Sequence, residues 1–185
     1  AFGTPGNATT DDVTTVVYDS DTQATVTTAS GGTRIYTIQS GPYRRITAVN
    51  ALGQGNAMQT FDAQGRLDNS TDRRGVVTHY EYASTGAYRS ATVEAVGTPE
   101  QRRQEITRDP ASNLITEQRT FNAAGTLKAK TTWSYNARNQ IAAVTATDPA
   151  DNATRTTGMS YCESADVAAP GSTCPIVGLL KQING

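Results

Sequence analysis

The chain has 185 residues and a mass of 19.6 kDa, enough for one domain with a hydrophobic core. Its net charge of -1 gives no electrostatic case for a nucleic-acid or membrane-surface partner, and no apolar run reaches the roughly 20 residues of a membrane helix. Hydrophobic residues make up only 36% and charged residues 18%, while Thr, Ala, Gly, Asn, Gln and Ser are abundant. This composition favours a sheet with one solvated face over a helical bundle.

Residues 1–12 are rich in Gly, Pro, Asn and Thr and show no hydrophobic period. They contain neither the basic start nor the apolar core of a secretory signal peptide. We expect a flexible leader.

Turn signals follow the leader at intervals of ten to fourteen residues. They begin at Asp19, Ser30, Ser40, Asn50, Asp62, Asp72, Ser84, Gly97, Asp109, Asn122, Asn136 and Asp148. Short strands at this spacing are typical of an all-β meander. The sequence therefore predicts twelve to fourteen antiparallel strands with negligible helix.

Many of these turns share one chemistry, seen best in Asp62–Gly65 and Asp72–Gly75. Asp at the first position accepts hydrogen bonds from the turn backbone, and Gly at the fourth takes a positive φ without steric cost. The pattern predicts a type I turn that ends in a left-handed residue and closes a hairpin. Other turns begin with Asp109, Asn122, Asn136 and Asp148 and carry at the fourth position Ser112 (the poorest fit), Gly125, Asn139 and Asp151.

The segments between turns alternate as strands do. Residues 66–71 and 76–82 are short and rich in β-branched and aromatic residues, which predicts an antiparallel hairpin. In residues 127–135, Trp133 and Tyr135 share one face and the lysines lie on the other. Residues 101–105 are compatible with either a helical turn or a strand. A Cys-flanked loop and an apolar strand over residues 176–183 end the chain.

Three segments carry a family resemblance: FDAQGRL from Phe61, FNAAGTL from Phe121 and YNARNQI from Tyr135, with a degenerate copy, RDPASNL, from Arg108. Each resembles the aromatic–Asp–x–x–Gly–x–Leu unit of YD repeats, and the segments from Asp72 and Asp148 resemble the Gly-x-x-Thr-x-Tyr half that follows. The chain is therefore similar to the Rhs/YD-repeat proteins over residues 13–161, with residues 162–185 continuing the repeat sheet.

The resemblance implies a ribbon of hairpins, curved into part of a β-spiral shell like those of Rhs toxins, Tc toxin components and teneurins. It implies a structural, non-catalytic role without a cofactor, in a secreted or cell-surface protein delivered by a bacterial secretion system. The implied partners are adjoining repeats of the parent chain and an encapsulated toxin domain. The sequence contains neither the family's aspartyl self-cleavage segment nor a toxin domain, so we expect part of a shell.

The resemblance also implies two sets of repeat residues. The turn set is Asp62, Gly65, Asp72, Gly75, Asp109, Asn122, Gly125, Asn136, Asn139 and Asp148. The packing set between neighbouring strands is Phe61, Leu67, Tyr80, Tyr82, Leu114, Phe121, Leu127, Trp133, Tyr135, Ile141 and Tyr161.

Cys162 and Cys174 flank a loop, an arrangement that suits a disulfide worth roughly 3 kcal/mol in the chain-entropy model. A zinc site would need more ligands nearby, and two reduced core thiols are the remaining alternative. A disulfide would indicate an oxidising destination.

Other residues have a functional and an ordinary interpretation. His79, the single histidine, shares a strand face with Glu81, but no Gly-x-Ser-x-Gly motif supplies a nucleophile. The Asp-rich turns at 19–21 and 148–151 offer calcium ligands, although turn geometry alone explains them. Three Arg pairs, at 44–45, 73–74 and 102–103, fall on adjacent strand positions that point to opposite faces.

Two rival roles stay open, a surface binding module and an enzyme built on a repetitive β scaffold, although the sequence lacks the acid/base cluster that such an enzyme would need. Asn7, Asn69 and Asn152 begin glycosylation sequons, which matter only in a eukaryotic secretory route. A carbohydrate- or protein-binding surface module would be favoured if Tyr80, Tyr82 and Trp133 were exposed together. We further expect the outermost strands, which carry few charges, to pair with copies of the chain or with adjoining repeats, and the shell's concave face to be unusually polar.

Overall fold

A computed structural model describes residues 13–51, 55–84 and 88–185. The described residues form one open sheet of fourteen strands, β1 to β14, in which every strand lies beside its neighbours in the sequence. The pairings are antiparallel, and the order contains no crossover. The prediction of an all-β antiparallel meander with twelve to fourteen strands is confirmed. The leader, residues 1–12, lies outside the described residues, as do parts of the turns that begin at Asn50 and Ser84.

The chain divides into two compact units. The first comprises Ala1–Tyr80 with Glu94–Val96, and the second comprises Glu81–Val93 with Gly97–Gly185. Strands β7 (Val77–Tyr82) and β8 (Arg89–Glu94) each contribute residues to both units.

The first unit contains six complete strands and most of a seventh. They are β1 (Thr15–Ser20), β2 (Gln23–Thr27), β3 (Thr33–Ile38), β4 (Ile46–Ala51), β5 (Asn56–Phe61), β6 (Leu67–Thr71) and β7 (Val77–Tyr82). In the predicted hairpin of β6 and β7, Asn69 lies opposite His79 and Thr71 opposite Val77. The strands are five or six residues long because a turn signal ends each of them.

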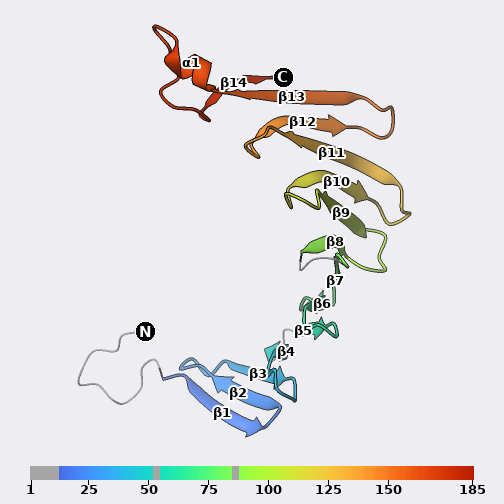
Figure 1. Ribbon diagram of the computed structural model, residues 1–185. Helices are drawn as coiled ribbons and strands as arrows, with labels where there is room; N and C mark the ends of the chain where they lie inside the picture. Colours follow the sequence, from blue (N-terminus) through green and yellow to red (C-terminus); the bar gives the residue numbers. More distant parts are fainter. Residues whose placement is uncertain (1–12, 52–54, 85–87) are drawn as a thin grey trace, which may run out of the picture. The chain divides into compact units, whose positions relative to one another are not determined.

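The strands of the second unit lie side by side in chain order (Figure 1), and most of them are longer than those of the first. They are β8 (Arg89–Glu94), β9 (Arg102–Arg108), β10 (Ile115–Phe121), β11 (Leu127–Tyr135), β12 (Ile141–Thr147), β13 (Thr154–Tyr161) and β14 (Leu180–Asn184). Residues 102–108 are a strand, which settles the ambiguity at residues 101–105.

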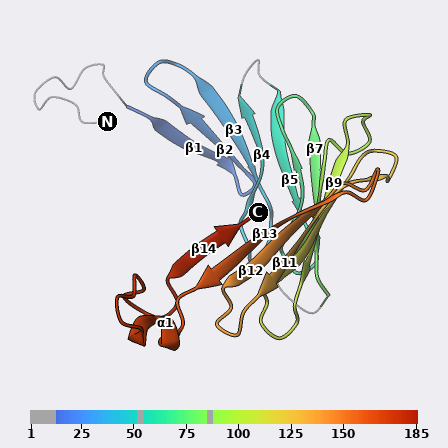
Figure 2. The same cartoon turned by 90° about the horizontal axis from the view of Figure 1, so that it is seen from above.

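The C-terminal part differs from the expectation in two respects. The predicted apolar strand over residues 176–183 begins later, at Leu180, because Gly178 adopts φ 90° in a turn. The preceding loop also contains a short helix, α1 (Ser164–Ala168), which the sequence analysis did not predict. It lies beside β14 at one end of β13 (Figure 2).

The sheet is a single layer, so few residues are buried. Among the described residues these are Ala24, Ala91, Val93, Cys162 and Cys174, and none is charged or polar.

The two faces of the second unit differ in chemistry. On one face Thr132 lies opposite Thr145, which lies opposite Thr156, and the last two hydroxyls are 2.9 Å apart. On the other face Trp133 lies opposite Val144. The alternation in residues 127–135 therefore separates a polar face from a more apolar one, as predicted.

Candidate functional site

The Asp–Gly turns are built from backbone and carboxylate hydrogen bonds. Between β5 and β6 the Gly65 amide donates to the Asp62 carbonyl oxygen at 2.9 Å, and the Asp62 carboxylate accepts from the Arg66 amide at 2.8 Å. Between β6 and β7 the Asp72 carboxylate accepts from the Val76 amide at 2.9 Å. The closing residues, Gly65 and Gly75, have φ values of 77° and 83°, the left-handed conformation that this turn type requires.

Asparagine takes the place of aspartate in two further turns. The Asn122 side-chain oxygen accepts from the Thr126 amide at 2.8 Å, and Gly125 closes this turn with φ 75°. The Asn136 side-chain oxygen accepts from the Gln140 amide at 3.0 Å, and Asn139 closes that turn with φ 62°. An amide oxygen accepts these bonds as a carboxylate does, so the turn tolerates either residue.

The turn carboxylates are held in their ionised form. The amide of Val76 is the main cause of the lowered pKa of Asp72, and Arg74 adds to it. The pKa of Asp109 is lowered chiefly by the amide and hydroxyl of Ser112. Hydrogen bonds to a carboxylate favour its charged form, so these side chains remain acceptors at neutral pH.

The two Asp–Pro turns are one residue longer than predicted. Asn113 and Asn152, with φ values of 60° and 59°, hold the left-handed position assigned to Ser112 and Asp151. The Asn113 amide donates to the Asp109 carbonyl oxygen at 2.8 Å, a bond four residues back where the Asp–Gly turns bond three back. Asn tolerates the left-handed region better than Ser, which accounts for the longer turn at Asp109.

The aromatic residue that precedes a turn contacts the previous turn on the same side of the sheet. The Tyr135 hydroxyl, just before the β11–β12 turn, donates to the Ile115 carbonyl oxygen at 2.6 Å, just after the β9–β10 turn. The Tyr161 hydroxyl donates in the same way to the Ile141 carbonyl oxygen at 2.8 Å. Both bonds span 20 residues, so one contact recurs in successive hairpins.

Phe61 achieves a related connection through an arginine. The guanidinium carbon of Arg45, at the start of β4, lies 4.9 Å from the centre of the Phe61 ring and 5.4 Å from that of Tyr43. Arg45 also donates to the Gly65 carbonyl oxygen at 2.6 Å. Phenylalanine cannot donate a hydrogen bond as tyrosine does. Here the cation–π contact and the Arg45 hydrogen bond connect the β3–β4 connection to the β5–β6 turn.

Arg103, opposite Phe121, joins a row of charges on the polar face. It contacts Glu81 at 2.5 Å and Glu105 at 2.7 Å, and the hydrogen bonds that it donates to these carboxylates raise its pKa. On β10 and β11, Glu117 accepts from Arg119 at 2.6 Å and from Lys130 at 2.8 Å. These charges neutralise one another within the sheet.

Every residue of the proposed packing set is half-buried. These residues are Phe61, Leu67, Tyr80, Tyr82, Leu114, Phe121, Leu127, Trp133, Tyr135, Ile141 and Tyr161. In a single-layer sheet a side chain is covered only by its neighbours on the same face, which explains the intermediate exposure. Tyr80, Tyr82 and Trp133 are therefore not the exposed aromatic platform that glycan binding would need.

His79 contacts polar side chains of β6. Its Nδ1 lies 3.0 Å from the Asn69 side-chain oxygen and 3.4 Å from an Asp68 carboxylate oxygen. Glu81, the other polar residue on its face, binds Arg103. This geometry places a carboxylate beside the imidazole and aligns no hydroxyl nucleophile with it among the contacts described.

The acidic turns use their carboxylates within the protein. Asp19 accepts from the Thr25 hydroxyl at 2.6 Å, and Asp21 lies 3.9 Å from Arg44. Asp148 and Asp151 accept from the amides of Ala150 and Ala153. The described part of the chain contains no group of three His, Cys, Asp or Glu side chains positioned for a metal ion.

The sequons differ in accessibility. Asn7 lies outside the described residues, Asn69 is half-buried and donates to Thr60 and Asp68, and Asn152 sits on an exposed turn. A search of the described residues for a helix with the length and apolarity of a membrane span found none.

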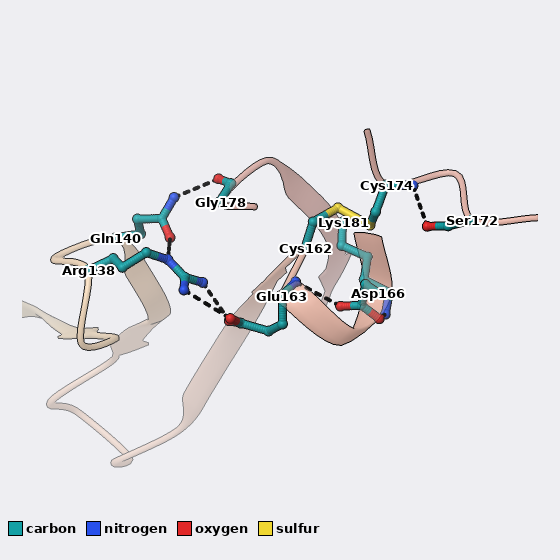
Figure 3. The surroundings of a disulfide bond; sticks show 9 residues. All are labelled: Arg138, Gln140, Cys162, Glu163, Asp166, Ser172, Cys174, Gly178 and Lys181. Carbon is teal, nitrogen blue, oxygen red and sulfur yellow. Dashed lines mark hydrogen bonds and ion pairs between the residues drawn. A yellow bond between two sulfur atoms is a disulfide. The ribbon is translucent and has the colours of Figure 1, made fainter. Parts of the chain in front are cut away.

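The structure contains a disulfide between Cys162 and Cys174, so the reduced alternative does not hold here (Figure 3). Arg138, in the β11–β12 turn, forms two hydrogen bonds to the Glu163 carboxylate, at 2.5 and 2.9 Å. Gln140 donates to the Gly178 carbonyl oxygen at 2.7 Å. The loop is thereby attached to the previous turn on its side of the sheet.

Sequence patterns did not reveal that Arg45, Arg138 and Gln140 connect turns. Each follows or lies within a turn and binds the next turn on the same side, so its partner is 20 residues or more away. These contacts could be predicted only by knowing which turns lie next to each other on one side of the sheet. That order follows from the strand lengths, which the sequence alone does not give.

No protein-family model and no curated protein matches this sequence. Among solved structures, the crystal structure of TcdB2-TccC3 matches with a TM-score of 0.51 and 15% identity, covering 76% of this chain. The two share a fold. The chain spans 8% of that TcdB2-TccC3 chain. The Photorhabdus luminescens Tc holotoxin pore with a TccC3 mutation matches at a TM-score of 0.43 and 13% identity over 79% of this chain and 9% of its own, and TcdB2-TccC3-TEV at 0.40 and 13% over 74% and 9%.

Proposed function

We propose that this chain is a structural, non-catalytic segment of an Rhs/YD-repeat shell, in a bacterial toxin or a large surface protein that is secreted or displayed on the cell surface. The observation that carries the proposal is the recurring contact between alternate turns, seen in the Tyr135–Ile115 and Tyr161–Ile141 hydrogen bonds. Such a contact lets a sheet grow by adding identical hairpins, because each aromatic residue needs only the preceding turn on its side.

The likeness in fold to TcdB2-TccC3 supports this role. The disulfide supports an oxidising destination, since disulfides persist outside the reducing cytosol. The partners would be adjoining repeats of the parent chain and, inside a completed shell, a toxin domain.

The edge of β1 offers a test. Within the described residues β1 pairs with β2 alone, all six of its residues are exposed, and Val13–Tyr18 carries no charge. An exposed edge strand with few charges is a template for another strand. Adjoining repeats would cover it in a shell, and another copy would cover it in the isolated chain.

Light scattering across a dilution series measures this pairing. We expect the chain to self-associate at high concentration and Val17→Lys, which charges the β1 edge, to remain monomeric. Ala123→Lys, in the exposed turn between β10 and β11, is the matched control and should associate as the unaltered chain does. A monodisperse monomer at every concentration would refute the shell role and favour a self-contained binding domain.

A further inference from the structure

The connection between β13 and β14 is longer than any other connection between the described strands. Residues 162–179 leave the sheet at a neck where the Cys162 amide donates to the Leu179 carbonyl oxygen and the Gly178 amide donates to the Cys162 carbonyl oxygen, both at 2.8 Å. Cys174 returns to Cys162 through the disulfide, which closes a separation of 12 residues. Figure 3 shows the disulfide between the neck and α1.

The disulfide is the buried centre of this region. Within residues 162–185, all of them described, only Cys162 and Cys174 are buried, with 3% and 5% exposure. Helix α1 has no buried residue, and all five residues of β14 are exposed. Apolar burial is the main source of local stability, so little besides the disulfide and the strand pairing retains β14.

The ion pairs of the connection provide weak attachment, in addition to the part-buried hydrogen bond from Gln140 to the Gly178 carbonyl oxygen. The Arg138 and Glu163 side chains that join it to the β11–β12 turn are 39% and 57% exposed. Lys181 of β14 contacts Asp166 of α1 at 2.5 Å, also near the surface. Exposed ion pairs contribute little because water and salt screen them.

We propose that the Cys162–Cys174 disulfide is a redox-sensitive fastener for β14, that is, a crosslink whose oxidation state decides whether β14 stays paired with β13. In the oxidised chain it holds the connection folded and keeps β14 paired with β13. In the reduced chain β14 detaches, and the amide and carbonyl groups of β13 that faced it become available to another strand. The strand presented at this edge of the sheet therefore depends on the redox state.

The chemical step is thiol–disulfide exchange with a dithiol. One thiolate of the dithiol attacks a cysteine sulfur and forms a mixed disulfide, and its second thiol displaces that sulfur. Two electrons and two protons pass to the protein, Cys162 and Cys174 leave as thiols, and the dithiol becomes a cyclic disulfide. In the opposite direction, the disulfide would form only after export into an oxidising compartment, and β14 would then be held against β13.

Hydrogen exchange followed by mass spectrometry tests the proposal on the full chain. The protein is measured before and after treatment with dithiothreitol, with the freed thiols alkylated by iodoacetamide. We expect amide exchange in residues 162–184 to accelerate by about ten- to a hundredfold, within the range expected for losing a loop closure of this size. Exchange in β9 to β12 should stay unchanged. Unchanged exchange in β14 would overturn the proposal, and so would an equal acceleration throughout β9 to β14, which would indicate a staple for the whole unit.

Two variants separate the disulfide from the polar contacts. The double variant Cys162→Ala and Cys174→Ala should reproduce the reduced pattern without reagent. Arg138→Gln keeps the disulfide and should accelerate exchange in β14 by no more than about fivefold, because it removes only an exposed pair. It should also shorten the half-time of reduction, since the buried sulfurs react when the connection opens. If Arg138→Gln matched the reduced protein, the ion pair would be the fastener and the proposal would be wrong.

Discussion

Arg45 donates a hydrogen bond of 2.6 Å to the carbonyl oxygen of Gly65, which joins the connection before β4 to the turn between β5 and β6. A Cβ atom built on Gly65 would lie 2.7 Å from both terminal nitrogens of that guanidinium. Gly65 thus supplies a positive φ, and a methyl group added there would displace the Arg45 guanidinium from its present position.

Substitution of Gly65 should cost more than substitution of an equivalent glycine. Gly75→Ala has open space around the new methyl group and should cost about 1 kcal/mol, the strain of a left-handed L-residue. Gly65→Ala adds the loss of the Arg45 hydrogen bond, for about 2 kcal/mol in total. Circular dichroism during urea unfolding measures both. Equal costs would show that the Arg45 contact does not stabilise the turn.

A double-mutant cycle isolates that contact. Once Arg45→Ala has removed the guanidinium, Gly65→Ala should cost only the strain, about 1 kcal/mol. Additive effects of the two substitutions would contradict the geometry.

Tyr161→Phe should destabilise the second unit by about 1 kcal/mol, because it deletes the hydroxyl that donates to Ile141 and leaves the ring in place. Tyr135→Phe should do the same through Ile115. Trp133 is the only tryptophan and lies in this unit, so its fluorescence follows the unfolding. Tyr18→Phe is the control, since Tyr18 is 78% exposed and should change nothing measurable. A loss below about 0.3 kcal/mol at both sites would mean that the ring packing, and not the hydroxyl, joins the turns.

The sequence predicted the turns and the strand count because both depend on local chemistry. Asp62 and Gly65 are sufficient to define their turn, and repetition at nearly constant spacing defines the meander. The sequence did not predict the length of a turn where two possible turns differ by a single residue. Pro110 and Pro149 fit the second position of a turn of either length, and only the folded register shows that Asn113 and Asn152 close these turns.

Contacts between alternate turns were beyond sequence reasoning for a different reason. Arg138 meets Glu163 across 25 residues, and Gln140 meets Gly178 across 38, so neither partner appears in a local window. Helix α1 was missed because it spans five residues and buries none of them, which leaves no hydrophobic period to detect. The sequence signal for this helix was the pair of acidic residues Glu163 and Asp166, three residues apart, which form a capping box in the structure.

The final prediction concerns acid stability and Glu117. The Lys130 ammonium beside this carboxylate is the main cause of its lowered pKa, and Arg119 adds to the effect. Because the folded state has the lower pKa, the unfolded chain binds the proton first as the pH falls. The contribution of Glu117 is therefore complete above its ordinary pKa of 4.5 and is lost as the pH falls from there through the folded value.

Glu117→Gln tests this dependence. The glutamine cannot ionise, so the variant should be less stable than the unaltered chain at pH 7, and the difference should shrink as the pH approaches 3, below the ordinary glutamate value. Urea unfolding followed by Trp133 fluorescence between pH 7 and about 3 measures the difference. The pKa values of Asp72 and Asp109 are also lowered, so their contributions to folding stability also fall in acid. These losses are the same in both proteins and cancel when the two are compared. A difference that stayed constant or grew toward low pH would show that the Glu117–Lys130 pair does not stabilise the folded sheet.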